Sequence, residues 1–561
     1  MNDLNADPNS SFPSSDTPSS DTGSSDTGPS ANGAGGPTAD VEHFAFTDRG
    51  PWVVDRDELS WLSGIDVLRA TTKRQAPLLT SRRRMPDLAR LAVVSSRIAV
   101  ALGGWAARDR PSGGSVSKAG LSRRLRIAAE HLGPTYIKLA QIISSGEGLF
   151  PSELVEEFRK CRDQVRPETF ETVRGVVETD LGAPLQSVFA HFDPEPLAAA
   201  SIAQVHAATL RTGEEVVVKV QRPTIRTQVH RDLKVMSWLA PFLVGRIPIA
   251  ALANPPALVE LFAETIGEEL DFRLEAENML DVAATFAALG QRGYIVARPH
   301  PELVTRRVLV MERLHGFAFE DLESMKAAEI DTHEVIRIGV VGFTEGCMVH
   351  GIFHGDLHAG NLFVTPDGRI ALMDFGITAR MTPLERNAFM RLMLTGAVGD
   401  IRGQIGAFRD LGALPADTDL DDVMRELGLD QAQVDPTSLS QEELVGEIQR
   451  IIKALMAMGA RLPKILMLYV KNLVFLDGAI AMLAPDLDMV SEMARLSTYM
   501  ATTHGEKLAN EMGMDLSAFE ADPAAIRAGF GIVDDDAEAP VTYRDLQARR
   551  ELIRKRLGQK H

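Results

Sequence analysis

The residues best suited to chemistry stand in two short blocks. The first, His-Gly-Asp-Leu-His-Ala-Gly-Asn, begins at His354 and places Asp356 five residues before Asn361; the second is Asp-Phe-Gly at 374–376. A carboxylate and an amide on one loop, with a second carboxylate after the next strand, can hold Mg²⁺ and orient an attacking group. A polar turn followed by a chance Asp-Phe-Gly is the alternative. The complete spacing favours phosphoryl-transfer chemistry.

An upstream lysine fits the same chemistry. Lys219 follows three valines after a Thr-Gly turn, and this β-branched run predicts a strand over residues 216–220. A strand lysine can reach nucleotide phosphates when an acidic residue on a helix holds it. Asp271 and Glu275 are four residues apart and share one face of a predicted helix, so both are candidates. Either one, considered alone, is more typical of a solvated surface charge.

The stretch before Lys219 lies where a phosphate-binding loop is expected, but residues 196–206 are rich in alanine, not glycine. The Cβ of alanine restricts the backbone and keeps it farther from a phosphate than glycine does. A plain alanine-rich helical turn is the alternative interpretation.

Together these blocks resemble the UbiB-like atypical kinases, also called the AarF/ADCK family. The resemblance covers about residues 130–380, weakens toward 490, and also rests on Gly133–Gln141 and Val218–Pro223. It implies an α+β, two-lobed protein-kinase-like fold with an N-terminal helical extension and a mostly helical C-lobe. It further implies binding of ATP and Mg²⁺, and a role in isoprenoid-quinone or other lipid metabolism with a lipid or prenyl-quinone-related ligand.

The resemblance gives each matching residue a role. The implied catalytic residues are Asp356, Lys219 and Glu275, and the implied metal ligands are Asn361 and Asp374. The implied nucleotide-binding residues are Ala198, Ala199, Ala200, Ser201, Lys219, Glu312 and Leu314. The implied regulatory extension, which in the family folds over the active site, comprises Lys138, Gln141, Glu269 and Asp271.

The chain departs from the family pattern in the extension. Ala140 stands where the family has glycine, and residues 144–151 lack the usual Arg-Pro-Asp. Two other functions stay open. One is a nucleotide-binding pseudokinase scaffold, because ligand residues serve binding and turnover alike. The other is a small-molecule phosphotransferase of the aminoglycoside or choline kinase type, which shares the His-Gly-Asp-x-x-x-x-Asn pattern.

The composition of the chain excludes several other classes of protein and of binding site. The 561 residues carry a net charge of −18, which disfavours nucleic-acid binding, and two cysteines exclude a disulfide framework or a multi-cysteine zinc site. Residues 1–40 have no Lys or Arg and no apolar run, so we expect no signal peptide. The apolar windows Val235–Ala253 and Ile465–Leu483 carry internal charges and read as buried helices, not membrane spans. We therefore expect a cytoplasmic protein, peripheral at a membrane if it contacts one.

One basic region suggests how such contact would arise. Residues 69–126 hold fourteen Lys and Arg against two Asp, and an apolar stripe from Leu88 to Trp105 predicts an amphipathic helix. That helix either lies on an anionic membrane or packs on the acidic body of the protein, and packing is the stronger expectation. The expected divisions are a disordered tail (1–45), a basic helical region (46–130), an N-lobe (131–315), a C-lobe (316–505) and a C-terminal tail (506–561).

Overall fold

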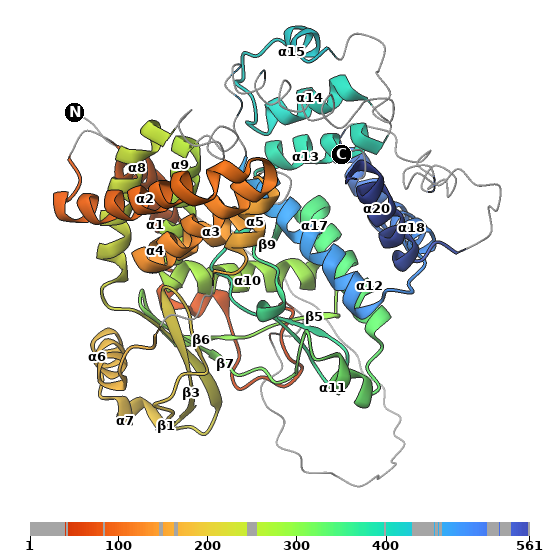
Figure 1. Ribbon diagram of the computed structural model, residues 1–561. Coiled ribbons are helices and arrows are strands. Elements are labelled where there is room, and N and C mark those ends of the chain that lie inside the picture. Colours follow the sequence, from red (N-terminus) through yellow and green to blue (C-terminus); the bar gives the residue numbers. More distant parts are fainter. Residues whose placement is uncertain are drawn as a thin grey trace, which may run out of the picture.

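The computed structural model describes residues 40, 43–81, 85–144, 150–161, 166–243, 255–397, 400–428, 454, 458, 460, 463–512, 527 and 540–558. Residues 1–39, most of the predicted tail, lie outside this set. The protein is an α+β molecule of two lobes, as predicted, with a layer of N-terminal helices against the lobes (Figure 1).

The N-lobe is built on a six-stranded antiparallel sheet in the order β1-β3-β4-β7-β6, with β2 paired to β3. Its strands are β1 (Phe189–Phe192), β2 (Ala198–Ala199), β3 (Ala203–Leu210), β4 (Glu215–Gln221), β6 (Pro299–Val304) and β7 (Val308–Glu312). On β4, Val216, Val218 and Val220 face α6 (Phe170–Leu181), whereas Val217 packs into the main core. Because side chains alternate along a strand, Lys219 shares the face of Val217.

Lys219 on β4 faces helix α10 (Phe272–Ala288). The predicted helical periodicity over 259–286 is divided into α9 (Pro255–Glu269) and α10. Asp271 makes the break, because its extended backbone and side chain cap α10, with the carboxylate accepting from the Arg273 N–H at 3.3 Å. The cap fixes the start of α10 and so places Glu275 in its first turn.

The C-lobe is mostly helical, with two small sheets. The first has the order β5-β11-β10-β8 and the second pairs β12 with β9. Its strands are β5 (Tyr294–Val296), β8 (Phe317–Ala318), β9 (Ile352–His354), β10 (Leu362–Val364), β11 (Ile370–Leu372) and β12 (Thr378–Arg380). Its helices are α11 (Leu322–Ala327), α12 (Thr332–Glu345), α13 (Pro383–Ala397), α14 (Ile401–Asp410), α15 (Leu420–Glu426), α17 (Lys464–Leu483), α18 (Met489–Met512) and α20 (Tyr543–Gly558). A five-residue π-helical segment, η4 (Gly346–His350), joins α12 to β9.

The remaining helices form the N-terminal layer. They are α1 (Ile65–Leu79), α2 (Leu88–Arg108), α3 (Gly114–Leu132), α4 (Pro134–Ser144), α5 (Ser152–Phe158) and α8 (Ile225–Leu243), whereas the short α7 (Leu185–Val188) lies beside β1 in the N-lobe. The predicted amphipathic helix is thus present as α2, and its stripe around Val94 and Ile98 packs on the protein. Arg90 fixes it there through a 2.6 Å ion pair with the fully buried Asp232. The packing expectation is therefore confirmed for this stripe.

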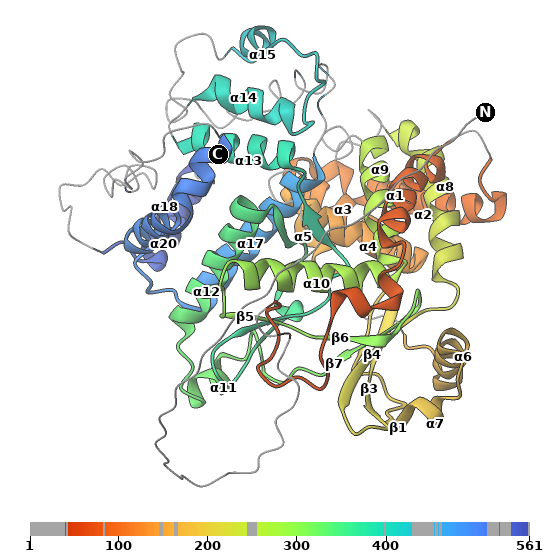
Figure 2. The ribbon, with the colours of Figure 1, turned by 180° about the vertical axis from the view of Figure 1, so that it is seen from behind.

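Three of our predicted boundaries do not fit the elements. Asp40, Phe44 and Ala45 are buried, so the tail does not extend to residue 45. The Ala45 N–H donates to the carbonyl of Ala283 on α10, and Figure 2 shows this segment along the back of the molecule. The boundaries after 130 and 505 fall inside α3 and α18, because the apolar faces of those helices continue past them.

Two helices in the described part of the chain are long and apolar enough to cross a membrane, judged by length and composition alone. In α17, 44% of the most apolar window is buried inside the protein, whereas in α2 the figure is 11%. The other window we considered, Val235–Ala253, overlaps the end of α8, and its second half lies outside the described residues.

Candidate active site

Lys219 lies at the centre of the site, between two carboxylates from distant segments. Its Nζ is 2.7 Å from Oε1 of Glu275 and 3.0 Å from Oδ1 of Asp374. The Lys219 and Glu275 side chains are buried, whereas the Asp374 side chain is 48% exposed. The structure therefore brings together three residues predicted from the sequence, with one carboxylate still facing solvent.

Burial and charge together set the protonation of this trio. Burial disfavours the Lys219 ammonium, but Asp374 and Glu275 outweigh it, so the pKa of Lys219 is raised. Burial also raises the pKa of Glu275, to about 7, because this carboxylate has only one lysine and shares it with Asp374. Partial removal from water would raise the pKa of the half-exposed Asp374, but the charges of Lys219 and Lys138 outweigh this effect and lower it.

The loop after β9 carries Asp356 and is held by backbone contacts. The Asp356 N–H donates to Nδ1 of His354 at 3.1 Å, and Nε2 of His354 lies 3.0 Å from the carbonyl of Met373. Burial lowers the pKa of His354, which favours the neutral ring that this pairing needs. Asn361 donates from Nδ2 to the Asp356 carbonyl at 3.0 Å, so its amide oxygen is the atom suited to a metal.

Helix α17 supplies two further contacts to this loop that our prediction missed. Lys471 Nζ pairs with Oδ1 of Asp356, and Asn472, fully buried, donates to the His354 carbonyl and accepts from the Leu357 N–H at 3.1 Å. Burial would raise the pKa of Asp356, but Lys471 and Lys138 lower it. The sequence did contain a signal for the contact of Lys471, because a lysine in the middle of an apolar helix needs a partner. We considered its charge only as an argument that Ile465–Leu483 does not span a membrane.

Helix α4 brings Lys138 to the same place. Its Nζ is 3.0 Å from Oε2 of the buried Glu269, and its charge lowers the pKa of both Asp356 and Asp374. Burial raises the pKa of Glu269, with Lys138 opposing. Gln141 lies three residues further on the same face of α4, half-buried. The structure thus places the predicted extension against the site.

Asp271 has a local structural role that we did not predict. Its carboxylate caps α10 and forms a 2.8 Å ion pair with Arg273. The sequence favoured a helix cap here, since Asp271 stands directly before the helical run, but we predicted only a place in the regulatory extension. That place stays a prediction.

The Asp-Phe-Gly segment holds an unusual backbone conformation. Asp374 has a φ of 54°, in the left-handed region that non-glycine residues rarely adopt. The Gly376 N–H donates to Asp374 Oδ1 at 3.2 Å, and Asn278 of α10 donates to the Phe375 carbonyl at 2.8 Å. These bonds compensate for a strain of about 1–3 kcal/mol, and such strain is typical of functional sites.

The alanine-rich stretch is a β-hairpin, so the helical-turn alternative is wrong. Ala198 and Ala199 pair with Val205 and Gln204, and the Ala200 N–H donates to the Ala203 carbonyl at 2.8 Å. Arg222, nearly buried, donates from Nε to the Ala200 carbonyl at 3.2 Å. Ser201, at the tip, is 2% exposed. The loop is therefore fastened to the end of β4.

The segment between the lobes has its own fixed contacts. The Glu312 carboxylate binds the buried Arg298 and accepts from Thr47 at 2.6 Å. The Glu312 and Arg313 N–H groups donate to the carbonyls of Arg298 and Glu215. Any contact from Glu312 to a ligand must therefore use its carbonyl, and Leu314 is the next residue that could offer its backbone.

The acidic residues here do not form a metal cage by themselves. Among the described residues, no group of three or more His, Cys, Asp or Glu side chains is arranged to hold a metal ion. Asn361 and Asp374 supply one amide and one carboxylate oxygen. Mg²⁺ commonly binds through one or two carboxylates together with substrate phosphates and water, so this pair fits a metal that arrives with a phosphate ligand.

Comparison with known proteins shows the family to which the chain is similar. Residues 160–404 match the ABC1 atypical kinase-like domain. The protein Rv0647c of Mycobacterium tuberculosis is 34% identical over 486 residues, which cover 82% of this chain and 94% of that protein. A probable protein kinase UbiB of Marinobacter nauticus is 31% identical over 374 residues, covering 66% of this chain and 68% of the relative.

This chain belongs to the UbiB-like atypical kinase family. An aarF domain-containing protein kinase of Arabidopsis thaliana, chloroplastic, is also 32% identical over 411 residues, covering 68% of this chain and 76% of that protein. The fold resemblance inferred from the sequence is thereby confirmed. The trio of Lys219, Glu275 and Asp374 lies within the part of the chain that matches the domain.

Proposed function

We propose that this UbiB-like protein binds Mg·ATP between its lobes and acts as an atypical kinase or ATPase. The observation that carries the proposal is Lys219 held between Glu275 and Asp374, with Asp356 and Asn361 on the neighbouring loop. In this proposal Lys219 contacts the nucleotide phosphates, Glu275 orients Lys219, and Asn361 and Asp374 ligate Mg²⁺. Asp356 orients the attacking group.

The other predicted residues complete the nucleotide site. The hairpin Ala198–Ser201 lies over the phosphates, and the backbone of Glu312–Leu314 contacts the base. Lys138 and Gln141 limit access to Asp356 and Asp374 from the side of α4, which favours small or membrane-borne acceptors over folded protein substrates. Bound Mg²⁺ would neutralise phosphate charge during transfer.

A thermal-shift titration with Mg·ATP tests the nucleotide site. We expect the wild-type melting temperature to rise with ligand, because binding to the folded state adds RT ln(1 + [L]/Kd) to its stability. Asp374→Asn should lose most of this rise, while Asp66→Asn, a matched change at an exposed position on α1, should keep it. A wild-type protein with no shift contradicts the proposal.

A nucleotide-binding scaffold without turnover is the second candidate. It is favoured by the ion pair between Lys471 and Asp356, which occupies the carboxylate that turnover would use. Phosphate release by the wild type and by Asp356→Asn separates the two. Equal, background-level release together with an intact Mg·ATP thermal shift favours the scaffold.

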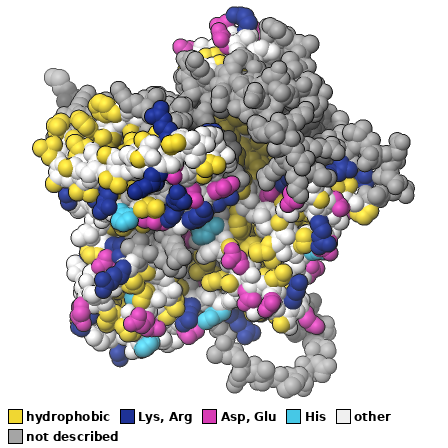
Figure 3. All heavy atoms as spheres, viewed as in Figure 1, with side chains coloured by type: hydrophobic (Ala, Val, Ile, Leu, Met, Phe, Trp, Pro, Cys, Tyr) yellow, Lys and Arg dark blue, Asp and Glu magenta, His cyan; other side chains and the backbone are white. Residues whose placement is uncertain are grey.

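We also propose that α2 contacts an anionic membrane surface, which places the enzyme near lipid substrates such as isoprenoid-quinone precursors. Its outward face is apolar: Val93 is 46% exposed and Val100 71% exposed. A surface helix normally carries polar residues there. Figure 3 shows hydrophobic side chains over this region, with Lys and Arg among them. Arg97 and Arg108 are the only charged residues on that face, and both are basic.

Vesicle co-sedimentation tests the membrane contact. We expect binding to phosphatidylglycerol-containing vesicles, weaker binding to pure phosphatidylcholine, and loss of binding at high salt because the basic charges are screened. Val100→Glu should weaken binding at least fivefold, whereas Leu384→Glu, at an 83% exposed position on α13, should not. Equal binding by all three proteins would remove α2 from the interaction.

A further inference from the structure

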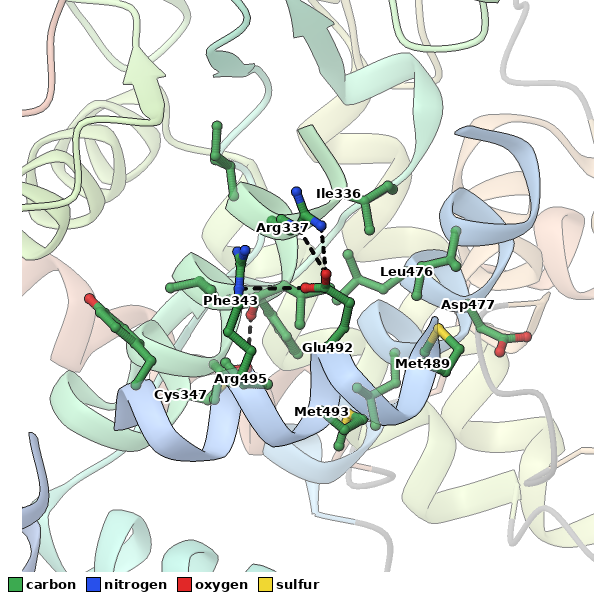
Figure 4. Close-up of a pocket in the computed structure, with 18 of the residues that line it drawn as sticks. Ile336, Arg337, Phe343, Cys347, Leu476, Asp477, Met489, Glu492, Met493 and Arg495 are labelled. Carbon is green, nitrogen blue, oxygen red and sulfur yellow. Dashed lines mark hydrogen bonds and ion pairs between the residues drawn. The ribbon is translucent and has the colours of Figure 1, made fainter. Parts of the chain in front are cut away.

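The C-lobe contains a large apolar cavity away from the nucleotide site. Its volume is about 1090 Å³, and its walls come mainly from α12, η4, α17 and α18. Phe343, Cys347 and Leu476 line its inner side, and Met493 lies at its rim (Figure 4). Sites for small molecules commonly enclose about 300–1,000 Å³ and are mostly apolar.

The charged groups at the rim already have partners. Glu492 accepts from Arg337 at 2.6 Å and lies 3.6 Å from Arg495, and Figure 4 shows both arginines turned toward it. At the other side, Arg550 forms a 3.0 Å pair with Asp477. An ionic ligand would have to break one of these pairs, so the cavity suits an uncharged molecule.

The cavity is long. On α17 its lining runs from Tyr469 to Ile480, and on α18 from Met489 to Tyr499. At 1.5 Å per residue, each wall extends about 15 Å. Water in a space with such walls gains few hydrogen bonds, whereas a flexible hydrocarbon chain would bury apolar surface along the whole length.

We propose that this C-lobe cavity binds one uncharged, elongated hydrocarbon chain, of the isoprenoid or acyl type. The chain lies between α12, α17 and α18, with its polar end at the rim where Arg337, Glu492 and Arg495 can offer hydrogen bonds. The site goes beyond the nucleotide chemistry and does not depend on it.

Two neutral probes test the site with the full chain and without nucleotide. Radiolabelled geranylgeraniol and 1-hexadecanol are titrated below their aggregation concentrations. We expect saturable one-to-one binding of at least one probe. Equal affinities indicate that the cavity binds any hydrocarbon chain. A tenfold preference for geranylgeraniol indicates an isoprenoid ligand, and a tenfold preference for 1-hexadecanol indicates an acyl-type ligand. Binding of neither probe overturns the proposal, including the case in which another part of the chain fills the cavity.

A substitution at the rim locates the binding. Met493→Trp, at a 38% exposed position, should fill the cavity and weaken probe binding at least tenfold, while Met85→Trp, at a 67% exposed position outside it, should not. In a Cys161→Ser background, saturating probe should also slow alkylation of Cys347 several-fold. Unchanged affinity in a folded Met493→Trp protein, with unchanged Cys347 alkylation, overturns the site. A normal Mg·ATP thermal shift in Met493→Trp would show that its nucleotide site is intact, so the outcome for the cavity is distinguished from the outcome for the nucleotide proposal.

Discussion

At the scale of single residues, the site depends on one lysine shared by two carboxylates. Lys219 serves both Glu275 and Asp374, and only Asp374 retains solvent contact. The buried Glu275 is thus the less well compensated of the two, because removing a carboxylate from water costs several kcal/mol that one shared partner does not fully return.

This imbalance predicts a pH-dependent stability. The pKa of Glu275 is raised from its ordinary 4.5 to about 7, so the folded state holds its proton more tightly than the unfolded state does. The resulting stability is present below about pH 4.5 and is lost as the pH rises through about 7. We expect Glu275→Gln to become more stable relative to the wild type across this window.

Denaturant unfolding at pH 5 and pH 7.5, without nucleotide, measures the effect. The matched control is Glu171→Gln, at an exposed position on α6. A difference between wild type and Glu275→Gln that stays constant with pH would contradict the prediction.

At the scale of elements, the same helix, α17, supports the Asp356 loop and forms part of the wall of the apolar cavity. Asn472 bonds two backbone groups of the loop, while Leu476, one turn later, lines the cavity. A movement of this helix would therefore act on both sites together.

The loop support gives a stability prediction. Asn472→Ala leaves the His354 carbonyl and the Leu357 N–H buried without their partner, which should cost about 2–4 kcal/mol. Asn510→Ala, at an exposed position on α18, should change stability by less than about 0.5 kcal/mol. Chemical denaturation compares them, and equal losses would show that the loop does not depend on Asn472.

The elements differ in how well the sequence predicted them. The strand around Lys219 was predictable because its β-branched run and turn are local features, and α2 because its stripe repeats at helical spacing. The lysine and carboxylate trio followed from family-like spacing. Lys471 was missed because its partner, Asp356, lies far away in the sequence. The capping role of Asp271 and the hairpin of residues 198–205 are local, and we missed them because we assigned Asp271 a role from the family and considered alanine only as a helix former.

At the scale of the whole molecule, the N-terminal segment is tied to the strand that leads between the lobes. Arg298 is fully buried and pairs with Asp40 at 3.0 Å and with Glu312 at 3.1 Å. A Cβ on Gly50 would lie 2.0 Å from the Arg298 guanidinium, so only glycine lets the segment pass this close.

This arrangement predicts that Asp40 stabilises the entire fold. Asp40→Asn leaves a buried guanidinium with one carboxylate fewer and should cost about 3 kcal/mol. Asp48→Asn, with its side chain 76% exposed, should cost less than about 0.5 kcal/mol. Urea unfolding followed by circular dichroism measures both, and a neutral Asp40→Asn would contradict the prediction.

The packing of α2 on α3 and of α3 on α4 has a consequence for the proposed activity. Helix α2 also contacts α4 directly, because the Arg90 guanidinium lies 5.7 Å from the centre of the Tyr136 ring. Lys138 is therefore on a helix that adjoins the outer helix. If α2 rests on a bilayer, as we propose, α4 and the Lys138 that it brings to the site would lie directly beneath the membrane-facing helix.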